Sequence, residues 1–384
     1  MESILRSRGL LILLALTLIV TSSCSSGPDR KTQVAQKGSD LETLLPGGRV
    51  YANDLGVDGP FHVRNAWLYE NEILVEDADG SITALSRDNL SALWYYDRLP
   101  ANVDFHPTAS PVSFLFLSDG ALYEVERKLG NQIRGGIPLN FVAAGAPAAT
   151  DSTAFVPCLA SDVGRPTIVT INLATGIEGW RVATRSSVLS AAVSGGTSSR
   201  PMIYFAEEKE GVYAYPAASA QRGAPDPSWA RLTHGRNLQA PVVHEDVVLV
   251  GSDRGDFWVL DRVTGLAHWS VMSGAAMKGR PWLSGDQVYF ANERGFHAYS
   301  REDGKYLWTY KAGGRFVVRR GEAVYLRQDG PGGDDTIHAL DPKTGELLRS
   351  VTHKGVHFLT NMMDDNFYAV TADGVVFKVD VGVE

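Results

Sequence analysis

Short hydrophobic runs separated by polar turns fill the chain after residue 47. Ala240–Val243 and Val247–Val250 are two such runs, and the three residues between them are polar. Runs of four to eight residues that are rich in valine and bounded by polar clusters are typical of β-strands. We therefore predict that the chain beyond residue 47 is all-β.

These runs belong to a repeated unit, which is clearest around Val259. An aspartate follows this anchor residue after two positions, Gly265 after six and Trp269 after ten. Eight copies recur at intervals of roughly 40 residues, a period typical of repeat architectures. Their anchors are Ala84, Glu124, Thr170, Ala214, Val259, Ala298, Ala339 and Lys378.

Each unit has room for four antiparallel strands, with the anchor on the third strand and the tryptophan on the fourth. The aspartate can close an Asx turn, and the glycine supplies a positive φ. Four such strands form one blade of a propeller, and we expect the large aromatic side chains to pack between neighbouring blades. The structural repeat residues are the tryptophans expected between blades, Trp94, Trp180, Trp269 and Trp308, and the glycines expected in the turns, Gly176, Gly265, Gly304 and Gly345.

The last unit ends at Glu384 and lacks room for a fourth strand. An unpartnered β-like run, Arg49–Asn53, precedes the first unit. We predict that these two ends pair. Residues 47–384 would then form a single eight-bladed β-propeller of four-stranded antiparallel blades, closed by its N- and C-terminal strands.

The N-terminal residues 1–23 have the pattern of a signal peptide. Arg6 and Arg8 precede an apolar run that begins at Leu10, and small residues lead to Cys24. The run is about half of the ~20 residues that a membrane-spanning helix needs. The pattern resembles a bacterial lipoprotein signal, which implies lipidation of Cys24, and ordinary secretion is the alternative. Residues 24–46 are polar and nearly periodless, so we expect a flexible tether.

The repeat A-x-D-x-x-T-G-x-x-x-W resembles that of the pyrroloquinoline-quinone-like (PQQ-like) β-propeller family. A lipoprotein signal followed by one such propeller is similar to the BamB family of outer-membrane protein assembly factors. This resemblance implies a non-catalytic scaffold that needs no cofactor, is lipid-anchored in the outer membrane and faces the periplasm. It also implies envelope proteins as partners, among them the β-barrel assembly machinery.

The composition narrows the function classes. The chain carries 36 basic and 44 acidic residues, a net charge of −8, which argues against a nucleic-acid partner. Its two cysteines, Cys24 and Cys158, exclude a disulfide framework and a cysteine-rich metal cluster. Catalytic quinoproteins resemble one another in having adjacent cysteines beneath the cofactor, and a lone Cys158 cannot form that disulfide. We interpret Cys158 as a buried, small apolar residue.

Two acidic turns, at Asp77–Gly80 and Gly332–Asp335, lack the later ligands of a calcium loop, so we interpret their carboxylates as solvated. His353 and His357 lie in a strand-like pattern about 13 Å apart, too far to share a metal. We therefore expect no catalytic, cofactor-binding or metal-binding residue. The alternative is a quinoprotein-type enzyme or small-ligand sensor, which acids, amides and aromatics converging at the channel mouth would favour.

Overall fold

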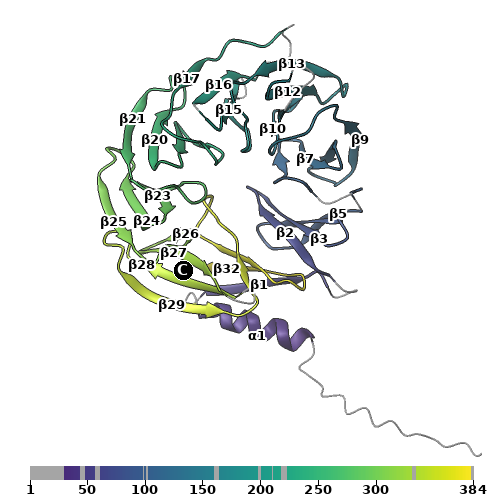
Figure 1. The fold of residues 1–384 in the computed structure, drawn as a ribbon. Coiled ribbons are helices and arrows are strands. Elements are labelled where there is room, and N and C mark those ends of the chain that lie inside the picture. The colour runs from purple at the N-terminus through teal and green to yellow at the C-terminus, as the bar shows by residue number, and fades with distance from the viewer. Residues whose placement is uncertain are drawn as a thin grey trace, which may run out of the picture.

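The computed structural model describes residues 30–43, 48–56, 61–97, 99–100, 103–159, 164–197, 200–209, 211–217, 223–330 and 334–381. Eight four-stranded antiparallel sheets follow one another around a ring (Figure 1). The predicted all-β, eight-bladed propeller is therefore confirmed. Among the described residues, no helix is long and apolar enough to span a membrane.

Each blade runs from an inner strand at the ring centre to an outer strand at the rim. In the first two blades the strands are β2 (Val63–Leu68), β3 (Glu72–Asp77), β4 (Ile82–Ser86) and β5 (Ala92–Tyr96), then β6 (Thr108–Ala109), β7 (Ser113–Ser118), β8 (Ala121–Glu126) and β9 (Gln132–Pro138). The next two contain β10 (Ala148–Ala149), β11 (Thr153–Cys158), β12 (Thr167–Asn172) and β13 (Glu178–Ala183), then β14 (Val193–Thr197), β15 (Arg200–Ala206), β16 (Val212–Pro216) and β17 (Trp229–Arg231).

The second half of the ring repeats this order. The fifth and sixth blades contain β18 (Val242–His244), β19 (Val247–Gly251), β20 (Asp256–Asp261) and β21 (Ala267–Met272), then β22 (Trp282–Ser284), β23 (Gln287–Asn292), β24 (Gly295–Ser300) and β25 (Tyr306–Tyr310). The seventh contains β26 (Arg315–Arg320), β27 (Ala323–Asp329), β28 (Asp335–Leu340) and β29 (Leu347–His353), and the eighth β30 (His357–Phe358), β31 (Phe367–Val370), β32 (Val375–Val381) and β1 (Gly48–Asp54).

The core is divided among the contacts between blades. Second strands such as β7 and β23 are buried along their whole length, because a neighbouring blade covers each face of the sheet. Eight hydrophobic clusters each combine residues of two adjacent blades. Phe114 of β7, for example, packs against Trp94 of the preceding blade with ring centroids 6.1 Å apart. Apolar burial between blades therefore holds the ring together.

The repeat positions lie where the sequence pattern placed them. All eight anchors are on the third strand of a blade, and Val259 pairs directly with Trp269 on the fourth. The side chain of Asp261 accepts hydrogen bonds from the backbone N–H groups of Val263 and Thr264, at 3.1 and 2.7 Å. Gly265 has a φ of 69°. The predicted Asx turn and positive-φ glycine are confirmed in this unit.

The two ends of the chain close the ring. β1 pairs antiparallel with β32 over seven positions, from Gly48 opposite Val381 to Asp54 opposite Val375. Figure 1 shows the purple β1 beside the yellow β32. The predicted pairing of the terminal strands is confirmed, and β1 is the outer strand of the eighth blade.

The prediction of a flexible tether is wrong for Arg30–Glu42, which form the helix α1. α1 lies against β1 and β32, with Leu41 fully buried. A Cβ atom at Gly38 would lie at ordinary contact distances of 3.8 Å from Val50 and 3.9 Å from Phe377, so this side of the helix faces the eighth blade. The polar sequence gains its order from this contact with the eighth blade. Residues 1–29, with the predicted signal peptide and Cys24, lie outside the described residues.

Candidate functional site: the mouth of the central channel

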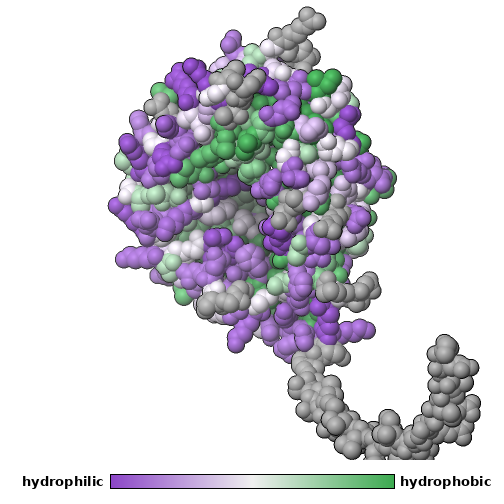
Figure 2. Space-filling view, turned by 45° about the vertical axis from the view of Figure 1, so that its right-hand side comes forward, coloured by the Kyte–Doolittle hydropathy of each residue, from purple (hydrophilic) through white to green (hydrophobic). Residues whose placement is uncertain are grey.

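Two adjoining cavities open at the centre of the ring, where Figure 2 shows a hollow. Their volumes are about 1120 and 440 Å³, and His106 and Arg280 line both. Much of their lining comes from loops that enter inner strands and from turns between second and third strands. In an up-and-down sheet these segments share one face. We call this face of the channel the mouth.

The larger cavity is rich in positive charge. The loop before β22 supplies Lys278 and Arg280, and the segment between β25 and β26 supplies Lys311. Together with Arg315 and Arg327 these residues outnumber the two acidic lining residues, Glu293 and Asp329. The lining is therefore cationic, although the chain as a whole carries a net charge of −8.

The acidic group of Asp329 is already paired. Its carboxylate lies 3.4 Å from a guanidinium nitrogen of Arg315 and 3.8 Å from one of Arg327. Lys278, Arg280 and Lys311 make no ion pair with any residue that the structure describes. We call the wall formed by Lys278, Arg280, Lys311 and Arg315 the cationic half of the mouth.

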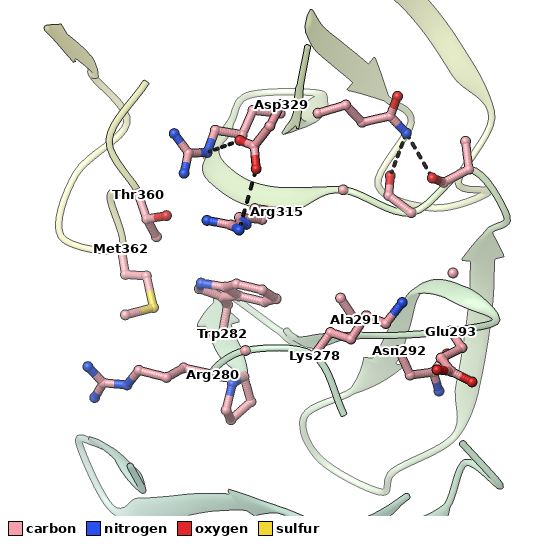
Figure 3. Close-up of a pocket in the computed structure, with 18 of the residues that line it drawn as sticks. Lys278, Arg280, Trp282, Ala291, Asn292, Glu293, Arg315, Asp329, Thr360 and Met362 are labelled. Atoms are coloured by element: carbon pink, nitrogen blue, oxygen red, sulfur yellow. Dashed lines mark hydrogen bonds and ion pairs between the residues drawn. The ribbon is translucent and has the colours of Figure 1, made fainter. Parts of the chain in front are cut away.

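Arg280 is exposed to the channel, although many protein atoms surround its guanidinium. This crowding lowers the pKa of the guanidinium, and the carbonyl oxygen of Pro241 at 3.4 Å accepts its hydrogen bond. Figure 3 shows Trp282 between the side chains of Arg280 and Arg315, with Met362 beside them. The cationic half therefore combines two arginine side chains with an aromatic residue on one cavity wall.

The opposite half of the mouth is apolar. Its cavity is lined by Phe105, Leu189 and Leu238, together with alanines from three consecutive loops. Leu189 is 40% exposed and Leu238 is 42% exposed. Figure 2 shows hydrophobic side chains gathered on one side of the hollow and hydrophilic ones on the other. We call the wall formed by Phe105, Leu189 and Leu238 the apolar half of the mouth.

A candidate group of metal ligands lies beside the larger cavity. Ligand atoms of Asp329, Asp335 and His357 fall within 4.8 Å of one another. The guanidinium of Arg327 lies among them, 3.3 Å from the Asp335 carboxylate and in contact with the His357 ring. Arg327 therefore supplies the positive charge that a metal ion would bring to this cluster. We propose no metal site there.

The interpretation of Asp335 as a solvated turn carboxylate is wrong. Its side chain is 2% exposed and accepts the backbone N–H of Phe358 at 2.8 Å. Burial opposes ionisation, but hydrogen bonds from His357 and Phe358 and the charge of Arg327 hold its pKa below the usual value. No local sequence pattern indicated this site, because Arg327 reaches Asp335 only across the paired strands β27 and β28.

Cys158 lies in β11, away from both cavities. It is 1% exposed, and its thiol donates a hydrogen bond to the carbonyl of Thr167 at 3.0 Å. Burial raises the pKa of the thiol. The interpretation of Cys158 as a buried residue is confirmed, and a raised pKa disfavours the thiolate that a nucleophilic cysteine needs.

The repeated tryptophans lie at contacts between blades. The indole nitrogens of Trp94, Trp269 and Trp308 donate hydrogen bonds of 2.7 to 2.8 Å to carbonyl oxygens of the next blade. Gly304 and Gly345 lie against the rings of Trp269 and Trp308 respectively.

The remaining repeat residues differ in their contacts. Gly265 packs against Trp229, the displaced tryptophan of the fourth unit, and Gly176 lies beside Ile137. Trp180 is 5% exposed and packs on Phe155 with ring centroids 5.8 Å apart. All of these side chains are remote from the mouth.

Sequence reasoning missed an arginine that recurs three positions after the anchor. The carbonyls of Arg127, Arg262 and Arg301 accept the indole hydrogen bonds from the preceding blade. The Arg127 guanidinium pairs with Glu72 of that blade at 2.7 Å. The signal was present at the regular spacing from Ala84, Glu124, Val259 and Ala298.

Comparison with known proteins supports the resemblance that the repeat indicated. The family model described as outer membrane protein assembly factor BamB matches residues 212–381, from the start of β16 to the end of β32. The similarity to PQQ-like propellers and to BamB is therefore confirmed. Comparison with curated proteins gives no match.

Several solved structures share the fold. BamB from Moraxella catarrhalis is 15% identical, covers 86% of this chain and 97% of that chain, and has a TM-score of 0.64. The quinohemoprotein alcohol dehydrogenase from Comamonas testosteroni is 11% identical, with 90% and 78% coverage and a TM-score of 0.58. The C-terminal WD40 domain of Sif2 is 11% identical, with 87% and 99% coverage and a TM-score of 0.59. At these identities the likenesses show the fold alone.

Proposed function

We propose that this protein is a non-catalytic scaffold that binds other envelope proteins at the bacterial outer membrane and aids the assembly of β-barrel proteins. The observation that carries the proposal is the match of residues 212–381 to the BamB family model. The likeness to BamB from Moraxella catarrhalis, which extends over 97% of that chain, supports the same architecture for both.

The surface suits a binding protein. Outer strands present apolar side chains beside their free edges, such as Tyr95 of β5 and Tyr306 of β25, which are 59% and 58% exposed. An exposed strand edge can pair with an extended segment of another chain through backbone hydrogen bonds. The apolar half of the mouth adds a second contact surface on the rigid ring.

We assign the first partner contact to the apolar half of the mouth. Leu238 is exposed there, while Leu266, 65% exposed, lies in the turn between β20 and β21. Turns between third and fourth strands lie on the opposite face of the ring. Leu266 therefore provides a matched control for an apolar-to-acidic substitution.

The test is capture of partners from detergent-solubilised envelopes, with mass spectrometry of the bound proteins. We expect the unaltered protein and the Leu266→Asp variant to recover β-barrel assembly proteins and the Leu238→Asp variant to lose them. The scaffold proposal fails if nothing is recovered and a deletion strain has normal levels of outer-membrane barrels.

A quinoprotein-type enzyme or small-ligand sensor is the second candidate, favoured by the cavity that contains Trp282, Asn292 and Gln328. Against an enzyme, Cys158 lines neither cavity and is hydrogen-bonded within β11 and β12. Reduction of a dye by the purified protein, dependent on added pyrroloquinoline quinone and calcium, would transfer the assignment to an enzyme.

Anchoring through Cys24 is part of the proposal. A Cys24→Ala variant should lose acyl labelling and leave the membrane fraction or remain unprocessed. Mature protein that stays on membranes without acyl groups would contradict the anchor and leave the scaffold role to be judged by partner capture alone.

A further inference from the structure

The two halves of the mouth occupy adjoining arcs of the ring, and the loop with Phe105 lies across the channel from the cationic half. The apolar half comes from loops before β6, β14 and β18, and the cationic half from loops before β22 and β26. Arg280 lines both cavities, so the two surfaces meet without an intervening wall. A ligand that crosses the mouth would therefore contact apolar side chains on one flank and basic side chains on the other.

The cationic half has unused binding capacity. Lys278, Arg280 and Lys311 have no acidic partner in the described part of the chain, although carboxylates pair with basic groups elsewhere on the ring. The Nδ2 atom of Asn292, a residue 5% exposed on the same cavity wall, also makes no hydrogen bond to the described residues. The three basic side chains are exposed to the channel, whereas a buried amide without an acceptor is costly. An anionic ligand would pair with the basic groups and could accept from the amide.

The spread of these groups favours an extended ligand over a compact anion. The basic residues come from two consecutive blades around a cavity of about 1120 Å³, rather than converging on one point. In an extended polypeptide, successive side chains point to opposite sides. A segment in which acidic and apolar residues alternate would present its carboxylates to one half of the mouth and its apolar side chains to the other.

We propose that the mouth of the channel binds an extended polypeptide segment in which acidic and apolar residues alternate. Arg280, Lys278 and Lys311 pair with its carboxylates, and Leu189, Leu238 and Phe105 contact its apolar side chains. This inference rests on the proposed function and names its ligand class, because strands of membrane β-barrels alternate between polar and apolar side chains before they insert.

The position of Arg280 supports this arrangement. Arg280 lines both cavities and has no ion-pair partner among the described residues. A carboxylate beside it would form a charge-assisted hydrogen bond. Arg280 is therefore the residue whose removal should weaken binding most.

The test uses isothermal titration calorimetry of the mature protein with short synthetic peptides. The first alternates Glu with Leu, the second alternates Gln with Leu, and the third alternates Glu with Ser. We expect the Glu-Leu peptide to bind at least about tenfold more tightly than either of the others, because each lacks one of the two contacts. Raising the salt concentration should weaken this binding, since it screens the charge pairs.

Variants identify the site. Arg280→Gln should weaken binding of the Glu-Leu peptide about tenfold, the loss expected for one charge-assisted hydrogen bond. Lys343→Gln removes the same charge from an exposed turn between β28 and β29, on the opposite face, and should leave the affinity unchanged. Circular dichroism and thermal melting verify that both variants fold.

Three results would overturn the inference. They are equal binding of the Glu-Leu and Gln-Leu peptides, an unchanged affinity in the Arg280→Gln variant, and displacement of the peptide by inorganic phosphate beyond the effect of chloride at equal ionic strength. The last result would identify a small-anion site. Partner capture from envelopes is measured in parallel, so a scaffold that binds partners but no peptide refutes this inference alone, whereas a protein without partners refutes the proposed function.

Discussion

Gly304 lies directly against the indole ring of Trp269 in the preceding blade. A Cβ atom at the glycine would be 2.5 Å from Cδ2 of the ring, and the residue has a φ of 67°. Both the backbone conformation and the contact therefore require glycine at this position of the repeat. The relationship explains how a glycine and a tryptophan far apart in the sequence form one unit of contact between blades.

Replacing Gly304 by alanine should destabilise the protein more than backbone strain alone. Gly120 has nearly the same φ, 68°, but a Cβ atom there would meet no other atom within 4 Å, so Gly120→Ala measures the strain by itself. We expect about 1–2 kcal/mol of destabilisation in that control and about 1–3 kcal/mol more in Gly304→Ala. Chemical denaturation provides the measurement, and equal losses would contradict the packing role.

Removing β1 should open the ring. Deletion of residues 48–54 leaves the edge of β32 unpaired and exposes the apolar surface of the eighth blade. We expect a markedly lower melting temperature and more aggregation than in a variant that lacks residues 30–43 but keeps β1. Scanning calorimetry and light scattering compare the two, and a deletion of β1 that melts like the intact chain would contradict the closure.

The helix α1 should detach when its buried contact is lost. Leu41 is fully buried against the eighth blade, and truncation of a buried leucine to alanine costs about 2–5 kcal/mol. Leu41→Ala should therefore accelerate proteolysis within residues 30–43 while the propeller stays intact. Ser39→Ala, at an exposed position of the same helix, is the control. Equal cleavage rates in the two variants would show that the leucine does not hold the helix.

Buried and exposed ion pairs between blades should differ in their contribution to the free energy of unfolding. Arg127 and Glu72 are 16% and 9% exposed, whereas the partners of Arg301, Glu245 and Asp246, are 61% and 67% exposed. Arg127→Met should cost about 3–5 kcal/mol, because it leaves Glu72 buried and unpaired. Arg301→Met should cost about 1 kcal/mol or less. Denaturation midpoints measure the stability lost in each variant. Adding Glu72→Gln to Arg127→Met should restore part of the lost stability, because it removes the unpaired charge.

Acidification should destabilise the fold partly through His297. Its ring nitrogens lie 2.7 Å from the Thr309 hydroxyl and 2.8 Å from the Asn292 amide oxygen, and burial lowers its pKa. The unfolded chain therefore takes up a proton at a higher pH than the folded one. The contribution is complete above the unfolded pKa of about 6.5 and falls as the pH drops below it.

A His297→Gln variant should lose less stability than the unaltered protein between neutral and mildly acidic pH. His62→Gln, at an exposed position, is the control for the same substitution outside the core. Thermal melting across this pH range provides the comparison. A His297→Gln variant with the original slope would assign the pH dependence to other groups.

The repeat was predictable because the sequence pattern of each blade is local. An aspartate for the turn, a glycine for the positive φ and a tryptophan at a fixed spacing act within about ten residues, so the pattern survives without knowledge of the neighbours. α1 was missed because Val34 and Leu41 gain burial only from the eighth blade. Their spacing of seven residues, with Gly38 between them, was the available signal.

The mouth of the channel could not be predicted, because its residues also come together only in the folded ring. Lys278 and Arg280 belong to one loop and Lys311 to the corresponding segment of the next blade, and the three share no spacing relative to the repeat. Their grouping results from the closure of the ring, which brings the loops of distant units around one axis. The same holds for Asp335, whose neutralising arginine lies on a paired strand.

The pairing of β1 with β32 also sets an order of events during folding. Gly48 and its neighbours precede every other strand of the ring in the sequence, yet their partner β32 follows all the other described strands. The loop that this contact closes contains nearly the whole chain, and closing a loop costs more entropy as it lengthens. We therefore expect β1 to pair late, after the blades between the two ends have formed.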